Sequence, residues 1–316
     1  MSKKIAFVFP GQGSQSVGML AELAETNPKV KEVYAEASEA LGYDLWELVQ
    51  SGPAESLNST DKTQPALLAA GIAVWECWKQ NNPDVEPVVM AGHSLGEYTA
   101  LVASGAMKFK DAIKLVETRG KLMQQAVPEG EGQMAAILGL DDEVIIDACK
   151  EAEQGQIVSA VNFNAPSQVV IAGAKAAVDR ACELLKEKGA KKAVVLPVSV
   201  PSHCELMKGA SEKLAAELNK IEIVKPEIPV LHNVDVQVAE DAAQIKDKLV
   251  KQLYCPVQWV KLVSSFSDYG VEGIVESGPG KVLFGLNKRI IKGVTTFPVF
   301  DVKSMEKAEA ALLGAL

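Results

Sequence analysis

Short apolar runs that stop at glycine or proline recur along this chain of 316 residues, and segments with apolar residues at helical spacing separate them. Ile5 to Phe9 ends at a proline and a glycine, and Pro87 to Ala91 runs into a second glycine-containing turn. Runs of this length and composition predict buried strands. Pro65 to Gln80 and Asp111 to Ala126 instead carry apolar residues three or four positions apart, which predicts helices. The alternation predicts an α/β fold.

The middle of the chain has a different order of elements. The patterns predict strands at 133–138, 157–163, 169–172 and 193–196, with helices at 142–152 and 174–188. The order β-α-β-β-α-β is that of a ferredoxin-like unit. A glycine-rich stretch at 128–132 precedes it and Pro197 follows it, and both suit hinges. We therefore expect residues 128–197 to form a small domain inserted into a larger α/β domain made of residues 1–127 and 198–316.

The last third of the chain returns to the alternation of the first. Ser202 is expected to begin a helix, because Leu206, Ala210, Leu214 and Leu218 would share one face. After it the patterns predict strands at 229–234, 273–276 and 295–300 and helices at 245–253, 260–266, 282–291 and 304–313.

Composition restricts the class of partner and the compartment. The net charge of −9 argues against a nucleic acid or an anionic membrane, because both attract basic surfaces. Five cysteines form no C-x-x-C pair, so we expect reduced intracellular thiols and no metal site. The sequence has neither an apolar stretch of roughly 18 residues nor a signal-peptide pattern at its start. A soluble, cytoplasmic protein is expected.

The segment Gly92-His93-Ser94-Leu95-Gly96 matches the G-x-S-x-G pattern of a nucleophile elbow. A predicted strand precedes it and a predicted helix follows it, which is the context that the elbow requires. The alternative is that Ser94 only caps the helix, with Glu97 completing a capping box. Both interpretations place Ser94 at a helix N-terminus.

Three histidines are available as a base for Ser94. His93 is adjacent to Ser94 on a sharp turn, so a structural role is expected, and His232 lies in a predicted strand, as a core histidine would. His203 follows Ser202 in a second capping-box pattern, which predicts the first turn of a helix. There the helix dipole would keep the ring neutral and basic. His203 is therefore the predicted base.

An acidic partner for the histidine is not evident. The aspartates between Ser94 and His203 have ordinary surface patterns, which favours a Ser-His dyad over a triad. Cys204 is a poor nucleophile candidate, because adjacent helical residues point about 100° apart. The loop Pro10 to Gln15 lacks the third glycine of a dinucleotide loop and has no Walker lysine. Its backbone N–H groups could instead face an oxyanion.

Four motifs in this order, FPGQGSQ, GHSLGE, VSVPSH and QLYCPVQW, resemble the malonyl-CoA:acyl carrier protein transacylase family over nearly the whole chain. The resemblance implies an α/β-hydrolase-like domain with a ferredoxin-like insertion. It also implies transfer of malonyl from malonyl-CoA to the phosphopantetheine thiol of acyl carrier protein by a ping-pong mechanism, with no tightly bound cofactor.

The resemblance also assigns roles to residues. It implies Ser94 as nucleophile and His203 as base, Gln12 and Leu95 N–H groups as oxyanion hole, Arg119 as the malonyl carboxylate clamp, the Gln252 carbonyl as acceptor from His203, and Asn162 at the site edge. From its local sequence alone, Arg119 would be a surface charge. The family often has Asn where this chain has Cys255, which affects little because the proposed Gln252 contact is made by backbone.

Carrier proteins of this pathway are acidic, so docking on a chain of net charge −9 requires a local basic patch. Two clusters are candidates: Lys281, Lys288, Arg289 and Lys292, or Lys186, Lys188, Lys191 and Lys192. Ordinary solvated surface is the alternative for both. Two other functions remain open at this point: a thioesterase-like serine hydrolase that uses the same dyad with water, and a non-catalytic carrier-binding protein.

Overall fold

A parallel sheet forms the centre of the larger unit in the computed structural model, which describes residues 3–198 and 200–314. Its strand order is β7-β2-β1-β8-β9, and each neighbouring pair is parallel. The strands are β1 (Ile5–Phe9), β2 (Val89–Gly92), β7 (Val230–Leu231), β8 (Gly273–Ser277) and β9 (Thr295–Val299). The predicted α/β class is confirmed for this unit.

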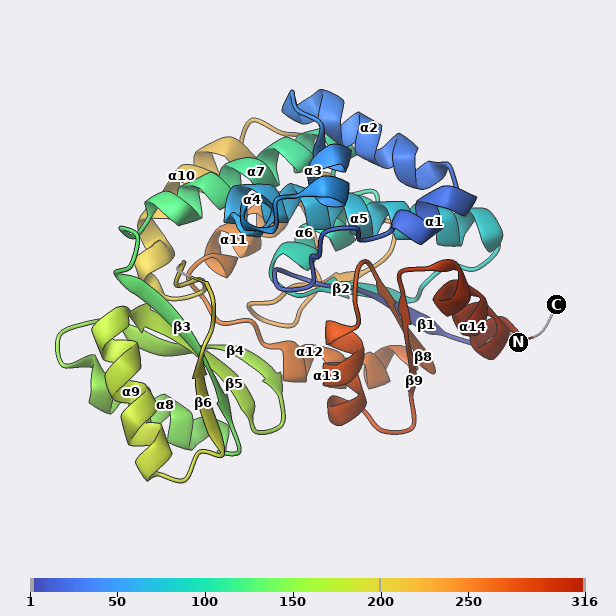
Figure 1. Ribbon diagram of the computed structural model, residues 1–316. Coiled ribbons are helices and arrows are strands. Elements are labelled where there is room, and N and C mark those ends of the chain that lie inside the picture. The colour runs from blue at the N-terminus through green and yellow to red at the C-terminus, as the bar shows by residue number, and fades with distance from the viewer. Residues whose placement is uncertain (1–2, 199, 315–316) are drawn as a thin grey trace.

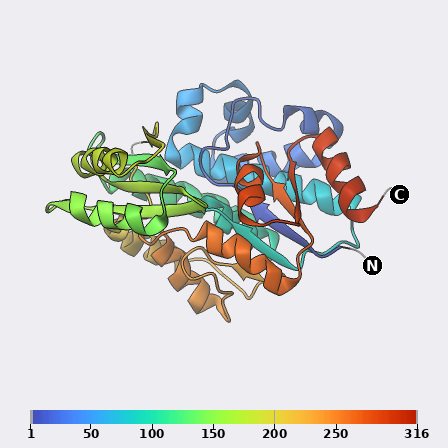
Figure 2. The ribbon, with the colours of Figure 1, turned by 90° about the horizontal axis from the view of Figure 1, so that it is seen from below.

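Helices cover both faces of this sheet (Figures 1 and 2). They are α1 (Ala21–Thr26), α2 (Lys29–Leu41), α3 (Leu45–Ser51), α4 (Ala54–Asn58), α5 (Thr60–Asn81), α6 (Leu95–Ala103), α7 (Phe109–Gln125), α10 (Lys208–Leu218), α11 (Ala242–Gln252), α12 (Trp259–Ser264), α13 (Val282–Ile290) and α14 (Val302–Leu313), with short 3-10 turns at Glu205–Met207 and Ser265–Tyr269.

Alternate side chains of β1 pack into two separate hydrophobic cores. Phe7 belongs to the core on the α5 side, where its ring lies 4.9 Å from that of Trp75. Ala6 and Val8 face the opposite core, which includes Trp259 of α12. A strand that is apolar on both faces is typical of a parallel sheet covered by helices on both sides. The continuous apolar run in the sequence has this cause.

The second sheet is antiparallel, with strand order β4-β5-β3-β6. Its elements follow in the predicted order: β3 (Gly132–Leu138), α8 (Asp142–Glu153), β4 (Val158–Ala165), β5 (Gln168–Ala174), α9 (Lys175–Glu187) and β6 (Lys192–Val195). Helices α8 and α9 pack on one face, with Ile137 and Ile171 in the core between them. The other face contributes Met134 to a small cluster that includes Cys204 of the larger unit.

Several predicted boundaries differ from those in the structure. Helix α5 begins at Thr60 instead of at Pro65, because the buried Thr60 and Thr63 place the preceding turn in the core. Strand β7 is only two residues long, because the chain turns after it: the Val236 N–H donates to the His232 carbonyl. No helix begins at Ser202, and α10 begins at Lys208. Within the described ranges, no helix is both long and apolar enough to cross a membrane.

Candidate active site

Ser94 lies on a tight turn between the end of β2 and the start of α6. Its φ of 51° is in a region that residues other than glycine rarely adopt. A Cβ on Gly92 would lie 1.8 Å from the carbonyl carbon of Gly96, and a Cβ on Gly96 would lie 2.0 Å from the carbonyl oxygen of Phe9. The turn therefore requires both glycines. This is the geometry of the predicted elbow.

The capping interpretation of Ser94 is wrong. Its side chain makes no cap hydrogen bond, and Glu97 is turned toward other partners. The Ser94 Oγ instead lies 2.8 Å from Nε2 of His203. The turn itself is held by Asn233, whose Oδ1 accepts from the Ser94 N–H at 2.7 Å and whose Nδ2 donates to the Gly92 carbonyl at 2.7 Å.

His203 occupies a turn, and the prediction that it starts a helix is wrong. Its φ is 66°, and the 3-10 turn begins only at Glu205. Its N–H donates to the Leu253 carbonyl at 2.9 Å, and its Nδ1 lies 2.6 Å from the Gln252 carbonyl oxygen. Because a carbonyl only accepts, Nδ1 carries the proton and Nε2 is free to accept from Ser94. A backbone carbonyl thus takes the position that a carboxylate holds in a triad.

Burial and the neighbouring guanidinium of Arg119 lower the pKa of His203 to about 3. Both causes disfavour the imidazolium, so the ring is neutral at physiological pH. The sequence predicts a neutral ring on the basis of a helix dipole. The ring is neutral for a different reason, since no helix begins at this residue.

Arg119 of α7 is 1% exposed, so the surface position inferred from its local sequence is wrong. Its Nη1 donates to Gln64 Oε1 at 2.7 Å, and its Nη2 lies 3.0 Å from Gln252 Oε1 and 3.3 Å from Ser94 Oγ. All of these acceptors are neutral. Burial is the main influence on Arg119 and lowers its pKa. A buried guanidinium without a directly bonded carboxylate can bind a carboxylate that enters the site.

A buried polar group behind Ser94 was not predicted as a unit. Glu97 accepts hydrogen bonds from Nδ1 of His232 at 2.6 Å, from the Asn233 N–H at 2.9 Å and from Nε2 of Gln252 at 2.9 Å. His232 is thus a core histidine, as predicted, and it is fully buried. His93 also has a structural contact, since its Nε2 lies 2.7 Å from Asn164 Oδ1.

A cavity of about 540 Å³ brings the predicted residues together. Its lining includes Ser94, His203, Arg119, Gln12, Leu95 and Asn162. Within residues 3–198 and 200–314, neither the Gln12 nor the Leu95 backbone N–H donates to a protein acceptor. The Asn162 side chain comes from β4, so the smaller unit contributes to the wall. Gln252 lies behind the cavity and reaches it through His203 and Arg119.

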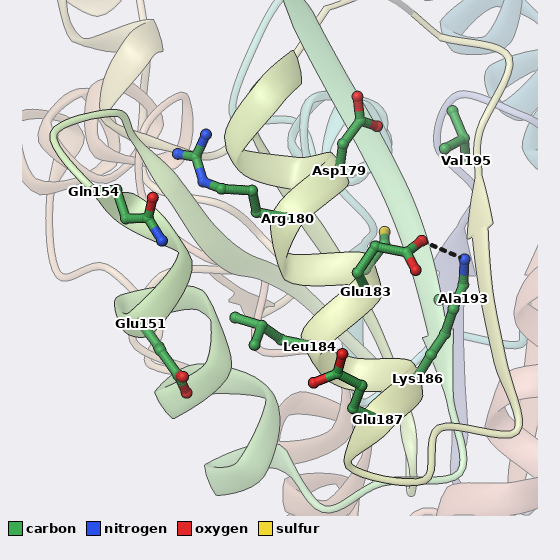
Figure 3. Close-up of a pocket in the computed structure, with 11 residues that line it drawn as sticks. Glu151, Gln154, Asp179, Arg180, Glu183, Leu184, Lys186, Glu187, Ala193 and Val195 are labelled. Atoms are coloured by element: carbon green, nitrogen blue, oxygen red, sulfur yellow. Dashed lines mark hydrogen bonds and ion pairs between the residues drawn. The ribbon is translucent and has the colours of Figure 1, made fainter.

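A second hollow, of about 580 Å³, lies on the smaller unit (Figure 3). Helices α8 and α9 and strand β6 line it, and the two helices contribute carboxylates, among them Glu151, Glu183 and Glu187. Cys182 also lines it, and burial raises the pKa of this thiol to about 11, so the thiol is protonated at neutral pH. The described residues contain no group of three or more His, Cys, Asp or Glu placed to hold a metal ion.

Comparisons with known proteins agree on one family. The model of the acyl transferase domain matches residues 6–311. A malonyl CoA-acyl carrier protein transacylase from Haemophilus influenzae is 60% identical over 311 residues, which is 98% of this chain and 100% of that protein. The crystal structure of an acyl carrier protein S-malonyltransferase from Vibrio cholerae superposes with a TM-score of 0.94 at 60% identity, covering 96% of this chain and 99% of that one.

A further solved structure contains two proteins. It holds a malonyl-transacylase in complex with the acyl-carrier protein of a type II PKS. It is similar to this chain with a TM-score of 0.96 at 55% identity, and the match covers 99% of this chain and 100% of that one.

Proposed function

The chain belongs to the acyl transferase family, and we propose that Ser94 carries the acyl group during its reaction. The activity is malonyl-CoA:acyl carrier protein transacylation, in which malonyl moves from malonyl-CoA to the carrier thiol in fatty-acid synthesis. One observation carries the assignment to Ser94: its Oγ lies 2.8 Å from Nε2 of His203 and 3.3 Å from Nη2 of Arg119. The Ser94 nucleophile therefore has both a base and a cation for the free carboxylate within hydrogen-bond distance of its oxygen.

The reaction proceeds in two half-steps. In the first, Nε2 of His203 takes the Ser94 proton while Oγ attacks the thioester carbon, and the C–S bond then breaks as the CoA sulfur takes that proton. In the second, the phosphopantetheine thiol of the carrier gives its proton to His203 and attacks the malonyl-serine ester. The C–O bond breaks and Ser94 recovers its proton. The chain's own groups supply this chemistry, and no tightly bound cofactor takes part.

The Gln12 and Leu95 backbone N–H groups stabilise the oxyanion that forms in each half-step. Support comes from their place in the cavity wall and from the absence of a protein acceptor for either N–H within the described residues. Leu95 is the first residue of α6, so its N–H also lies at the positive end of a helix dipole. Asn162 of the cavity wall lies at the edge of the site.

Arg119 selects the malonyl group by pairing with its free carboxylate. Binding of this carboxylate also offsets the positive charge that helps to lower the pKa of His203. The base therefore becomes stronger when the correct substrate is present. An acetyl group brings no such charge and leaves the buried guanidinium unpaired.

The two units are proposed as domains with the limits drawn from the sequence. Residues 1–127 and 198–316 form an α/β-hydrolase-like domain, and residues 128–197 form an inserted ferredoxin-like domain. The strand order β4-β5-β3-β6 and the β-α-β-β-α-β succession support this division. The five free cysteines are consistent with a reducing compartment, and we place the protein in the cytoplasm.

Product analysis tests the assignment of function. Incubation of the protein with malonyl-CoA and holo-carrier should give malonyl-carrier, and Ser94→Ala should give none. Omitting the carrier should leave malonyl on the protein with little free malonate. Rapid release of malonate without a carrier would contradict a transferase and indicate a hydrolase, an alternative that the comparisons do not favour.

A further inference from the structure

Glu97 is a buried carboxylate directly behind the cavity. It lies on α6 three residues after Ser94, its side chain is 0% exposed, and it does not line the cavity. Burial of a carboxylate is costly unless it is hydrogen-bonded, and the three contacts with His232, Asn233 and Gln252 meet that need. These contacts explain how the charge is tolerated. They also point to what it does, because one of them reaches Gln252.

The contact with Glu97 determines which way the Gln252 side-chain amide points. A carboxylate accepts hydrogen bonds and donates none, so Nε2 of Gln252 must face Glu97. The amide oxygen Oε1 is then directed at Arg119, whose Nη2 lies 3.0 Å away. The reverse orientation would set the amide NH₂ group against the guanidinium, which leaves two donors without an acceptor.

Gln252 joins the three groups on which the proposed reaction depends. Its side-chain oxygen holds Arg119, its Nε2 also donates to the Ser94 carbonyl at 2.9 Å, and its main-chain carbonyl accepts from His203 at 2.6 Å. It is the last residue of α11 and is fully buried. A change in the position of Gln252 would therefore disturb both the His203 base and the Arg119 guanidinium.

An indirect partner also suits the task of Arg119. A carboxylate bonded directly to the guanidinium would occupy the paired donors that a substrate carboxylate needs. Through the Gln252 amide, Glu97 attracts the guanidinium without bonding to it, and the buried Nε of Arg119 has no hydrogen-bond partner among the described residues. Burial lowers the pKa of Arg119, and the charge of Glu97 acts in the opposite direction.

We propose that Glu97 is a positioning residue: by orienting the Gln252 amide, it directs Arg119 toward the substrate carboxylate and holds the Gln252 carbonyl under His203. The inference rests on the transfer proposed above and deepens it. Selectivity for an acidic acyl group then depends on a carboxylate that never touches the substrate.

The test compares kcat/KM for malonyl-CoA and acetyl-CoA in Glu97→Gln, which removes the charge at nearly constant volume. The kcat/KM for both substrates should fall, because the carbonyl that positions His203 is disturbed. The kcat/KM for malonyl-CoA should fall further, because Arg119 is also displaced. Partners that orient metal-binding histidines are worth about 10- to 100-fold in activity, and we expect the malonyl-to-acetyl ratio to drop by about 10-fold. The ratio is measured on one sample, so the fraction of folded protein cancels. If Glu97→Gln is insoluble, Glu97→Asp withdraws the carboxylate from Gln252 and is interpreted in the same way.

Glu276→Gln is the matched control. Glu276 is also 0% exposed, but it accepts from the backbone N–H groups of Leu283 and Phe284, and it does not line the cavity. Its substitution should leave the malonyl-to-acetyl ratio unchanged. In an Arg119→Ala background, Glu97→Gln should change the ratio no further, because the residue through which it acts is gone.

The outcomes separate the two proposals. An unchanged ratio in Glu97→Gln, an equal change in Glu276→Gln, or a full effect in the Arg119→Ala background would overturn the inference and leave the proposed function intact. A wild-type protein that transfers no malonyl would overturn the proposed function itself.

Discussion

The cavity around Ser94 and the hollow on the smaller unit have similar volumes, about 540 and 580 Å³, but they treat charge in opposite ways. In the hollow, Lys186 and Glu183 are more than half exposed and pair with each other at 2.7 Å (Figure 3). In the cavity, Arg119 is buried and its acceptors are neutral oxygens. Exposed pairs are screened and already satisfied, whereas a buried cation with neutral partners is available to a charged ligand. Charge burial therefore distinguishes the site better than volume does.

The largest expected effect follows from the pair of Ser94 and His203, which the hollow lacks among its lining residues. A positioned general base contributes about 10²- to 10⁴-fold to a rate, so His203→Ala should lower kcat/KM for malonyl transfer by that order. Steady-state assays with malonyl-CoA and holo-carrier measure the loss. Lys186→Ala in the hollow is the control and should retain full activity. A loss below about 10-fold for His203→Ala would mean that another group serves as the base.

The next effect tests the buried cation. A charge-assisted hydrogen bond is worth about 1.5–3 kcal/mol, which corresponds to roughly 10- to 150-fold in rate. Arg119→Ala should therefore lower kcat/KM for malonyl-CoA by this factor and that for acetyl-CoA far less, since acetyl has no carboxylate to pair. Competition between the two CoA esters measures the change. Equal losses for both substrates would remove Arg119 from this role.

The pH dependence tests the cause of the neutral base. Catalysis needs neutral His203, and the pKa of this ring is lowered from its ordinary value of 6.5 to about 3 by burial and by Arg119. The neutral form therefore persists as the pH falls, and kcat/KM should stay level from about pH 8 down to about pH 5. An acid limb with a midpoint near 6.5 would contradict this environment. Circular dichroism at each pH confirms that the protein stays folded.

The smallest expected effect concerns carrier docking and compares the two basic clusters. In the second cluster, Lys186 pairs with Glu183 and Lys188 lies 3.5 Å from Glu151. In the first, Lys281 and Lys288 line a separate hollow, and neither has an ion-pair partner among the described residues. We therefore expect Lys288→Glu to raise the KM for the carrier several-fold without changing that for malonyl-CoA. Lys186→Glu should change neither constant, and the reverse result would move docking to the smaller unit.

Much of the fold could be predicted because its signals are local. The apolar run Ile5–Phe9 coincides with β1, and the six elements of the smaller unit follow in the expected order. The turn at His203 could not be predicted in this way. Its positive φ is maintained by contacts with Leu253 and Gln252, which lie some fifty residues further along the chain. These contacts prevent the helix that the capping pattern at Ser202 predicts.

The residues of the site differ in the same way: some have a local sequence signal and others do not. The elbow at Ser94 has a strong local pattern, and the glycines that permit it are part of that pattern. Arg119 has a weaker signal, since it lies on the buried face of α7 with Leu115, Val116 and Met123 at helical spacing. The Glu97 cluster joins residues more than 130 positions apart, and no local pattern connects them. At the level of sequence, only the family resemblance assigns Arg119 and Gln252 to the site.

The central claim is that Ser94 carries the malonyl group, and mass spectrometry of the intact protein tests it most directly. Wild-type protein mixed with malonyl-CoA in the absence of carrier should gain one malonyl group, located on the peptide that contains Ser94. Addition of holo-carrier should remove it, and Ser94→Ala should never acquire it. A malonyl group on another residue, or transfer to the carrier without any acylated protein, would contradict the account.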